Sequence, residues 1–326
     1  MRPPFIEIAR PGRTRHQGFT LVEMIISLTL LAILSTAVMP MVKVPMDAYM
    51  AATARTRVTT DLDWVQSKLG ADFATALPNS VRVKAAGTRY FIEFLPVHAQ
   101  GRYRSNTSGA AQICPATPAC GGATVADALE FGAAPACTET CFFSLGPLTP
   151  VGNAAVVPGT DLVVVNPTNT LGATGDPYAN AGPGVQSIKA PLLAAVFNAA
   201  RYGSQITMTP NAFPIGSAAK RFYVIGASPV TYECDTVSGT LIRHWGYAIS
   251  PVQPVAFGAG LPSATLSTAV ACNITSTATS VSAYEPAGVR GRGGVVTLKM
   301  TLTTPGNGTS VPEQAELVFS SAVNDG

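Results

Sequence analysis

The hydrophobic pattern changes along the chain, from an unbroken apolar run to helical spacing and then to strand-like alternation. Between Phe19 and Val42 every residue is uncharged except Glu23. At 1.5 Å of rise per residue this run measures about 36 Å as a helix, which is enough to cross a bilayer. The run therefore predicts a transmembrane helix over residues 19–44.

Helical spacing resumes after Pro40 and Pro45, which can each kink or locally melt a helix. The apolar positions then recur every three or four residues, as in an amphipathic helix, at Val58, Leu62, Val65, Leu69, Phe73 and Leu77. Pro78 ends the pattern. We expect residues 45–78 to be the second half of one long helix whose stripe packs on a sheet. A separate core helix is the alternative.

Strand patterns follow the helix. "YFIEFLPV" (90–97) is the first expected strand, and residues 100–220 are rich in Gly, Ala, Pro, Thr and Asn, which predicts loops with short strands. After residue 220 the alternation is regular, in "RFYVIGA", "VTYECD", "TLIRHWGYAI", "VVTLKMTLTT" and "EQAELVFSSAV". An antiparallel sheet on the helix gives an α+β fold, with a long disulfide-stapled, loop-rich insertion that has little core of its own.

The charged residues are few and unevenly placed. Only 12% of residues are charged and 47% are hydrophobic, as in an exported, turn-rich protein rather than a disordered one. The formal charge of +3 arises within residues 1–18, where Arg2, Arg10, Arg13 and Arg15 face only Glu7. The rest of the chain is balanced, so we expect no nucleic-acid partner.

Six cysteines all follow the apolar run: Cys114, Cys120, Cys137, Cys141, Cys234 and Cys272. An even number behind an export signal indicates disulfides in an oxidising compartment. Zinc is the competing interpretation, but C-x-x-C pairs are absent and the histidines are only His16, His98 and His244. Spacing favours the pairs Cys114–Cys120, Cys137–Cys141 and Cys234–Cys272, while the crossed pairing Cys114–Cys141 with Cys120–Cys137 stays open.

The apolar run opens with "GFTLVE" (18–23) behind a short basic leader. A plain membrane anchor, a signal peptide cut near Ser35 and Ala37, and a cut after Gly18 are the three interpretations. A charge in hydrocarbon costs roughly 2.5–3.5 kcal/mol, so Glu23 should have a partner or a task.

This junction resembles the processing site of type IV prepilins and pseudopilins: a small residue at the cut, Phe after it, Glu four residues further on and an apolar helix behind. The resemblance implies that a prepilin peptidase removes residues 1–18 by cutting after Gly18 and that the amine of Phe19 is N-methylated. The new cation lies one helical turn from Glu23. An intermolecular pair between them would set the axial register of helices in a filament.

The resemblance also implies where the protein acts. It implies a single-pass inner-membrane protein with a periplasmic β-rich domain at residues 79–326, which later joins a pilus filament. Its partners would be the prepilin peptidase, other major and minor pilins, the inner-membrane assembly platform and membrane lipid. The flanking charges favour this orientation only slightly, and the cysteines behind the span favour it more strongly.

Two further segments, "ALPNSVRV" (76–83) and "KRFYVIGASPVTYECDTVSGTLIRHWGY" (220–247), resemble minor pilins of the J-like and mannose-sensitive haemagglutinin pilus groups. They imply a non-catalytic subunit of pilus biogenesis, and the large ectodomain suggests a place at or near the tip. A J-like minor pseudopilin of a type II secretion system is the alternative, and a single-span periplasmic enzyme is a weaker one.

Catalytic motifs are absent from the sequence: it has no nucleophile elbow, P-loop or H-E-x-x-H. We therefore predict no enzyme, no cofactor and no metal. "GVRGRGG" (288–294) precedes a strand pattern and indicates a turn, and His244 is expected to be a packed or edge histidine rather than a base. Asp161 and Asp176 are calcium candidates, but their spacing fits no known loop.

Overall fold

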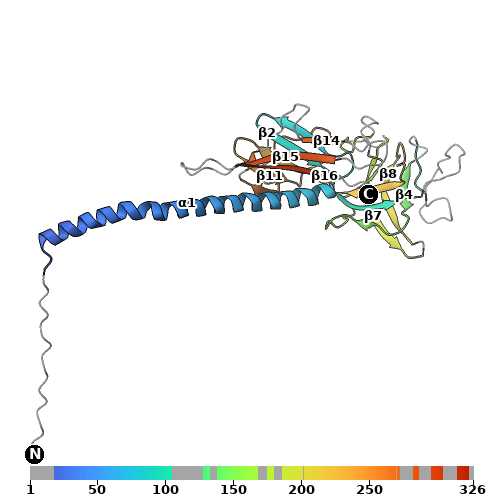
Figure 1. The fold of residues 1–326 in the computed structure, drawn as a ribbon. Helices are drawn as coiled ribbons and strands as arrows, with labels where there is room; N and C mark the ends of the chain where they lie inside the picture. Colours follow the sequence, from blue (N-terminus) through green and yellow to red (C-terminus); the bar gives the residue numbers. More distant parts are fainter. Residues whose placement is uncertain are drawn as a thin grey trace, which may run out of the picture. The chain divides into compact units, whose positions relative to one another are not determined.

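A computed structural model shows the fold of the chain (Figure 1). It divides into two compact units, Met1–Arg55 and Thr56–Gly326, which are considered separately. The residues that it describes are 18–104, 128–132, 138–167, 175–179, 186–200, 202–268, 270–271, 282–285, 295–303 and 314–322.

One helix, α1, runs from Leu21 to Ala74 and contains both Pro40 and Pro45. The chain therefore has one long helix, and neither proline interrupts it, although each removes one backbone donor. The helix ends four residues before Pro78. Its last turn closes through a hydrogen bond from the Thr75 hydroxyl to the Asp72 carbonyl.

In the part of the chain that the structure describes, three antiparallel sheets follow the helix. The first has five strands, in the order β1 (Arg82–Ala86), β2 (Arg89–Phe94), β10 (Val230–Asp235), β11 (Thr240–His244) and β12 (Ser263–Ser267). The second has seven strands, in the order β4 (Glu139–Phe143), β8 (Gly203–Asn211), β7 (Lys189–Asn198), β6 (Leu162–Val165), β9 (Arg221–Ile225), β3 (Val97–Arg102) and β5 (Thr149–Pro150).

The third sheet has four strands and is built around β15 (Val295–Thr303). On one side β15 pairs with β16 (Gln314–Ala322), and its other partners are β13 (Val270–Ala271) and β14 (Ser282–Glu285). The alternating segments expected after residue 220 are therefore strands. The helix followed by antiparallel sheets confirms the α+β class.

The first two sheets share one strand ribbon. Strand β2 leads into β3, β9 leads into β10, and the two lines pair antiparallel in both sheets. The ladder is interrupted at Pro96, which has no amide proton to donate. There the Gly226 amide donates to the Pro96 carbonyl at 3.0 Å. A Cβ on Gly226 would lie 2.8 Å from Nε2 of His98, so the bend requires a glycine.

The apolar stripe of α1 packs on the five-stranded sheet, as the helical spacing predicts. Val65, Leu69 and Phe73 are completely or almost completely buried, in one cluster with Phe94 and Tyr232. Leu77 lies beyond the helix end and belongs to a different apolar cluster, whose strand residues come from the seven-stranded sheet. The side chains of Val58 and Leu62 are outside the described residues.

Asp72 fixes the position of the helix on this sheet through two hydrogen bonds to strands, and a third bond comes from its own helix. Its carboxylate accepts from the Tyr232 hydroxyl at 2.6 Å and from Arg243 Nε at 2.7 Å. Lys68, one turn earlier, donates at 3.1 Å. Burial alone would raise the pKa of Asp72, but these donors outweigh it and hold the pKa below its usual value.

The seven-stranded sheet differs from the expectation for residues 100–220. That region was expected to be a loop-rich insertion with little core, yet its strands enclose a buried cluster that includes Phe142, Val163, Leu192, Ile206 and Phe213. Strands such as β7, "KAPLLAAVFN", contain alanine and proline, which strand propensity disfavours. Burial against neighbouring strands outweighs that preference.

Two buried glutamates meet at the edge of this second sheet. Glu139 opens β4 and is 4% exposed, and Glu130 is 1% exposed. The backbone amide of Glu130 donates to the Glu139 carboxylate at 3.2 Å. Burial, together with the charge of Glu130, raises the pKa of Glu139 to about 7 against the lowering effect of that hydrogen bond.

The raised pKa of Glu139 predicts a pH-dependent stability. Below its unfolded pKa of about 4.5 the carboxyl is neutral in both states, and stability is lost as the pH rises from there to about 7. Glu139→Gln keeps the acceptor and should remove this loss, on the order of 3 kcal/mol. Thermal unfolding of the full chain between pH 4.5 and about 8 measures it.

Asp63→Asn, which changes an exposed carboxylate of α1, is the control and should leave the pH profile unchanged. If the stability of the wild type runs parallel to that of Glu139→Gln across this pH range, the raised pKa assigned to Glu139 is contradicted.

Candidate functional site

The start of α1 is organised by Thr20. Its hydroxyl accepts the backbone amide of Glu23 at 3.3 Å, and its carbonyl accepts the amide of Met24 at 3.1 Å. Threonine at this position satisfies one of the free amides of a helix N-terminus. The carboxylate of Glu23 lies in the first turn, where the helix dipole favours negative charge. The helix therefore begins directly behind Gly18 and Phe19.

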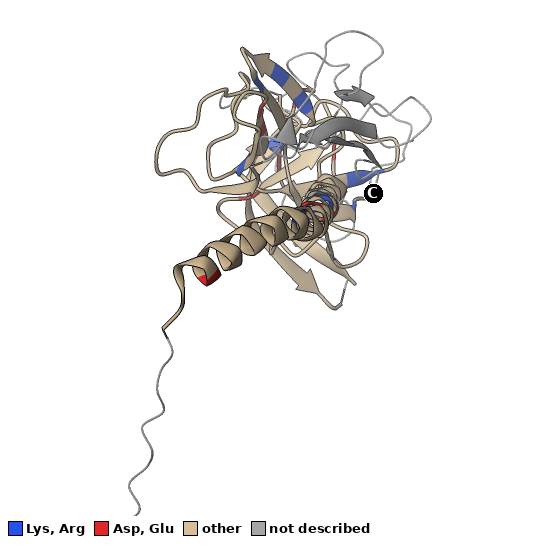
Figure 2. Cartoon of the chain, turned by 60° about the vertical axis from the view of Figure 1, so that its left-hand side comes forward, with Lys and Arg blue, Asp and Glu red and all other residues tan. Residues whose placement is uncertain are grey.

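The residues around the expected cleavage point are accessible. Phe19 is 81% exposed, and a Cβ built on Gly18 meets nothing within 4 Å. Figure 2 shows an acidic residue in red at the start of the helix, where the first turn contains Glu23. The described residues give the Glu23 side chain no hydrogen bond or ion pair, so its charge is available to a partner.

The hydroxyl groups of the apolar run are satisfied inside the helix itself. Each donates to the carbonyl three residues earlier: Ser27 to Met24, Thr29 to Ile26, Ser35 to Ala32 and Thr36 to Ile33. Such local bonds remove the cost of placing a hydroxyl in hydrocarbon. By length and composition, α1 is the one described helix that is able to cross a membrane.

The candidate residues for metal or acid-base chemistry have partners within the protein. Asp161 lies 2.8 Å from Nδ1 of His98 and accepts the amide of Val157. Asp176 accepts the amide of Tyr178 in a local turn. Among the residues that the structure describes, no three His, Cys, Asp or Glu side chains form a group suited to a metal ion.

His244 is a packed histidine, as its place in a strand suggests. Its Nε2 lies 2.8 Å from a carboxylate oxygen of Glu233, and its ring stacks on Phe257 with centroids 4.1 Å apart. The glycine-rich segment 288–294 lies outside the described residues.

Only two of the six cysteines fall among the described residues. Cys141 on β4 and Cys234 on β10 are both disulfide-bonded. No described cysteine pairs with another described one, and Cys114, Cys120, Cys137 and Cys272 lie outside that part of the chain. Strand β13, which ends at Ala271, contacts β10, which carries Cys234.

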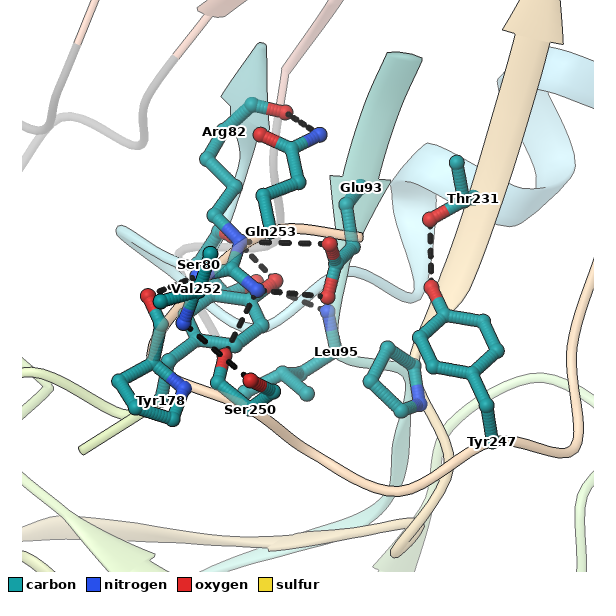
Figure 3. Close-up of polar contacts among 12 residues, drawn as sticks. Ser80, Arg82, Glu93, Leu95, Tyr178, Thr231, Tyr247, Ser250, Val252 and Gln253 are labelled. Atoms are coloured by element: carbon teal, nitrogen blue, oxygen red, sulfur yellow. Dashed lines mark hydrogen bonds and ion pairs between the residues drawn. The ribbon is translucent and has the colours of Figure 1, made fainter. Parts of the chain in front are cut away.

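One polar cluster of the second unit has no counterpart in the expectations from sequence (Figure 3). Arg82 on β1 and Glu93 on β2 face each other across the hairpin and form an ion pair at 3.0 Å. The carboxylate is completely buried, and burial raises its pKa even though Arg82 opposes the rise. The alternation "VRVKAA", followed by the turn Gly87-Thr88, is the signal that would have predicted this hairpin.

The comparison with protein families gives one result. Residues 13–39 match the prokaryotic N-terminal methylation motif. Searches among curated proteins and among solved structures found no match.

The fold and this motif together define a class of protein. A long N-terminal apolar helix followed by antiparallel sheets is a pilin-like α+β architecture. The chain carries the N-terminal methylation motif of type IV prepilins and pseudopilins, as the "GFTLVE" junction predicts. The motif implies processing by a prepilin peptidase, inner-membrane anchoring and assembly with pilins.

We propose that cleavage follows Gly18 and that Phe19 becomes the methylated first residue. N-terminal sequencing of protein taken from the native membrane should then begin at Phe19 and show a methylated amine. Gly18→Leu should accumulate as the full-length form, because the processing site has a small residue at the cut. A Cβ on Gly18 meets nothing within 4 Å, so the leucine should not disturb the fold.

The matched control is Gly12→Leu, which lies just before the motif and should be processed normally. A mature N-terminus between Thr36 and Met39 would show ordinary signal-peptide removal instead and would exclude this assignment.

For the cysteines we propose the pair Cys234–Cys272, which would connect β10 with the strand that precedes Cys272. By the chain-entropy model this bond should add about 3–4 kcal/mol, less any strain. Peptide mapping without reduction should recover the linked peptide from periplasmic protein. Recovery of Cys234 linked to any other cysteine would exclude the pairing.

Proposed function

We propose that this chain is a minor pilin of a type IV pilus of the mannose-sensitive haemagglutinin kind, most similar to the O-type minor pilin of that system. In this proposal residues 1–18 are removed, residues 19–44 cross the inner membrane, residues 45–78 form the spine of the subunit and residues 79–326 are periplasmic. The protein waits in the inner membrane and then enters the filament at or near its tip.

The observation that carries the proposal is the methylation motif at the head of a helix whose far end packs on a sheet. The motif occupies residues 13–39, and Val65, Leu69 and Phe73 of the same helix are buried against the sheet. A signal peptide would be discarded and would need no such continuation. A helix that is retained can fill the centre of a filament while its own domain stays outside.

The size of the ectodomain supports a position at the tip. The seven-stranded sheet has a core separate from the one on the helix. A bulky second sheet would be difficult to accommodate at every repeated position along a fibre, whereas one copy at the end meets no such limit.

The more specific resemblance rests on segment 220–247, which forms β9, β10 and β11. Two of these strands belong to the sheet that packs on α1, so the likeness falls on the pilin-like part of the protein. The expected partners are the prepilin peptidase, major and other minor pilins, the inner-membrane assembly platform and lipid.

A J-like minor pseudopilin of a type II secretion system is the second candidate. The segment "ALPNSVRV" (76–83), which leads from α1 into β1, resembles the J-like group as well as the mannose-sensitive haemagglutinin group. Pilus genes beside this gene would favour the pilus, and genes for a secretin and a secretion ATPase would favour the secretion system.

Deletion and complementation test the function together with the role of Glu23. Deletion should lower the number of surface pili, and the wild-type gene should restore it. Glu23→Ala should remain in the membrane, because it removes a charge that costs roughly 2.5–3.5 kcal/mol there. It should fail to restore pili, because the ammonium of Phe19 loses its counter-ion. Pili are counted by electron microscopy, and membrane retention by immunoblot.

Asp47→Ala is the matched control, since it removes an exposed carboxylate of the same helix outside the motif. It should restore pili fully. Unchanged pili but lost protein secretion in the deletion strain would favour the pseudopilin. Full restoration by Glu23→Ala would show that the charge pair is dispensable.

A further inference from the structure

Two segments that are far from Arg82 in sequence contact its guanidinium group, which also pairs with Glu93 on the neighbouring strand (Figure 3). Its Nη2 and Nε donate to the Glu93 carboxylate at 3.0 and 3.3 Å. Its Nη1 and Nη2 also donate to the carbonyls of Pro251 and Ser250, at 2.9 and 2.8 Å. The aromatic ring of Tyr178 lies 3.6 Å from the guanidinium carbon.

The first of these segments is the connection from β11 to β12, residues 245–262, which we call the strap. It covers the face of the five-stranded sheet opposite α1. Phe91 and Glu93 lie on this face, because they alternate along β2 with Ile92 and Phe94, which face the helix. The amide of Gln253 donates to the Phe91 carbonyl at 3.0 Å.

Aromatic side chains complete the attachment of the strap. The Tyr247 hydroxyl is hydrogen-bonded to that of Thr231, as Figure 3 shows, and Phe257 stacks on His244. The strap is therefore attached by polar contacts, by ring stacking and by the packing of Trp245 and Ile249 against neighbouring apolar clusters.

The second segment belongs to the connection between β6 and β7 of the seven-stranded sheet. Tyr178, which is 3% exposed, stacks under Arg82 and donates its hydroxyl to the Ser80 carbonyl at 2.8 Å. Asn79 donates to the Pro167 carbonyl at 2.8 Å, at the other described part of this connection. The connection thus lies against the turn between α1 and β1.

The chemistry of the site requires an arginine. The Glu93 carboxylate is completely buried and needs a positive partner. The carbonyls of the strap need donors, and the Tyr178 ring offers a face to a flat cation. A planar guanidinium meets all three needs at once, whereas the ammonium of lysine is a compact point charge.

We propose that Arg82 is a coupling residue that attaches the strap and the β6–β7 connection to the helix-packed sheet at the same time. The two larger sheets of the Thr56–Gly326 unit consequently keep one relative orientation, and the seven-stranded sheet is presented as a rigid extension. This inference does not depend on the pilus assignment.

Hydrogen exchange of the full chain in detergent tests the coupling in the double variant Arg82→Met/Glu93→Met. Removing both charges leaves no unpaired buried ion, so the melting temperature should stay near that of the wild type. Amides of residues 245–262 and 175–179 should nevertheless exchange at least about tenfold faster, while those of β10 stay within about twofold. Arg82→Lys keeps a positive charge beside Glu93 but loses the planar guanidinium, so the amides of the same two segments should again exchange faster.

Arg89→Met is the matched control. Arg89 lies on the neighbouring strand and pairs with Glu233 and Asp235, and its loss should leave both segments protected. Unchanged exchange in the double variant and in Arg82→Lys would overturn the proposal. Loosening of only one segment, or equal loosening by Arg89→Met, would overturn it as well, because the coupling would then not run through Arg82.

Discussion

The contact between the last turns of α1 and the five-stranded sheet determines how the rest of the Thr56–Gly326 unit is arranged. Val65, Leu69 and Phe73 supply the apolar part, and each such side chain contributes about 1.5–3 kcal/mol when fully buried. Asp72 fixes the register, because its carboxylate bonds to Tyr232 and Arg243 on two different strands. A shift of the helix by one residue would leave this buried charge without its partners.

The same helix meets two different surroundings, and its sequence is divided accordingly. Its first half is apolar on every side, and the hydroxyls there bond back to their own helix. Its second half is apolar only on a stripe, and the remaining positions are polar. Glu23 is the one charged residue between Phe19 and Val42. A charge that the helix itself does not satisfy is consistent with a partner outside the chain.

Local periodicity explains how much of this fold and site the sequence predicts. The processing junction follows from the resemblance of "GFTLVE" to prepilins. The helix and the strands after residue 220 follow from spacing within some ten to twenty residues. The core of the seven-stranded sheet does not, because its strands are short or rich in Ala and Pro and become stable only beside one another. Local patterns predict the cluster at Arg82 even less well, since its carbonyl partners are 168 and 169 residues away in sequence.

The shared strand ribbon shows how a second sheet can be added to a pilin-like fold without altering its helix contact. Strand β2 continues into β3 and β10 is preceded by β9, so the seven-stranded sheet grows from one end of strands that the first sheet already contains. The bend at Pro96 and Gly226 interrupts the ladder, and backbone pairing alone leaves the angle between the sheets weakly defined. Contacts across the joint, from Tyr178 to Ser80 and from Tyr178 to Arg82, must then set that angle. The methylation motif lies wholly in the other unit, so changes in the second sheet leave the chemistry of processing intact.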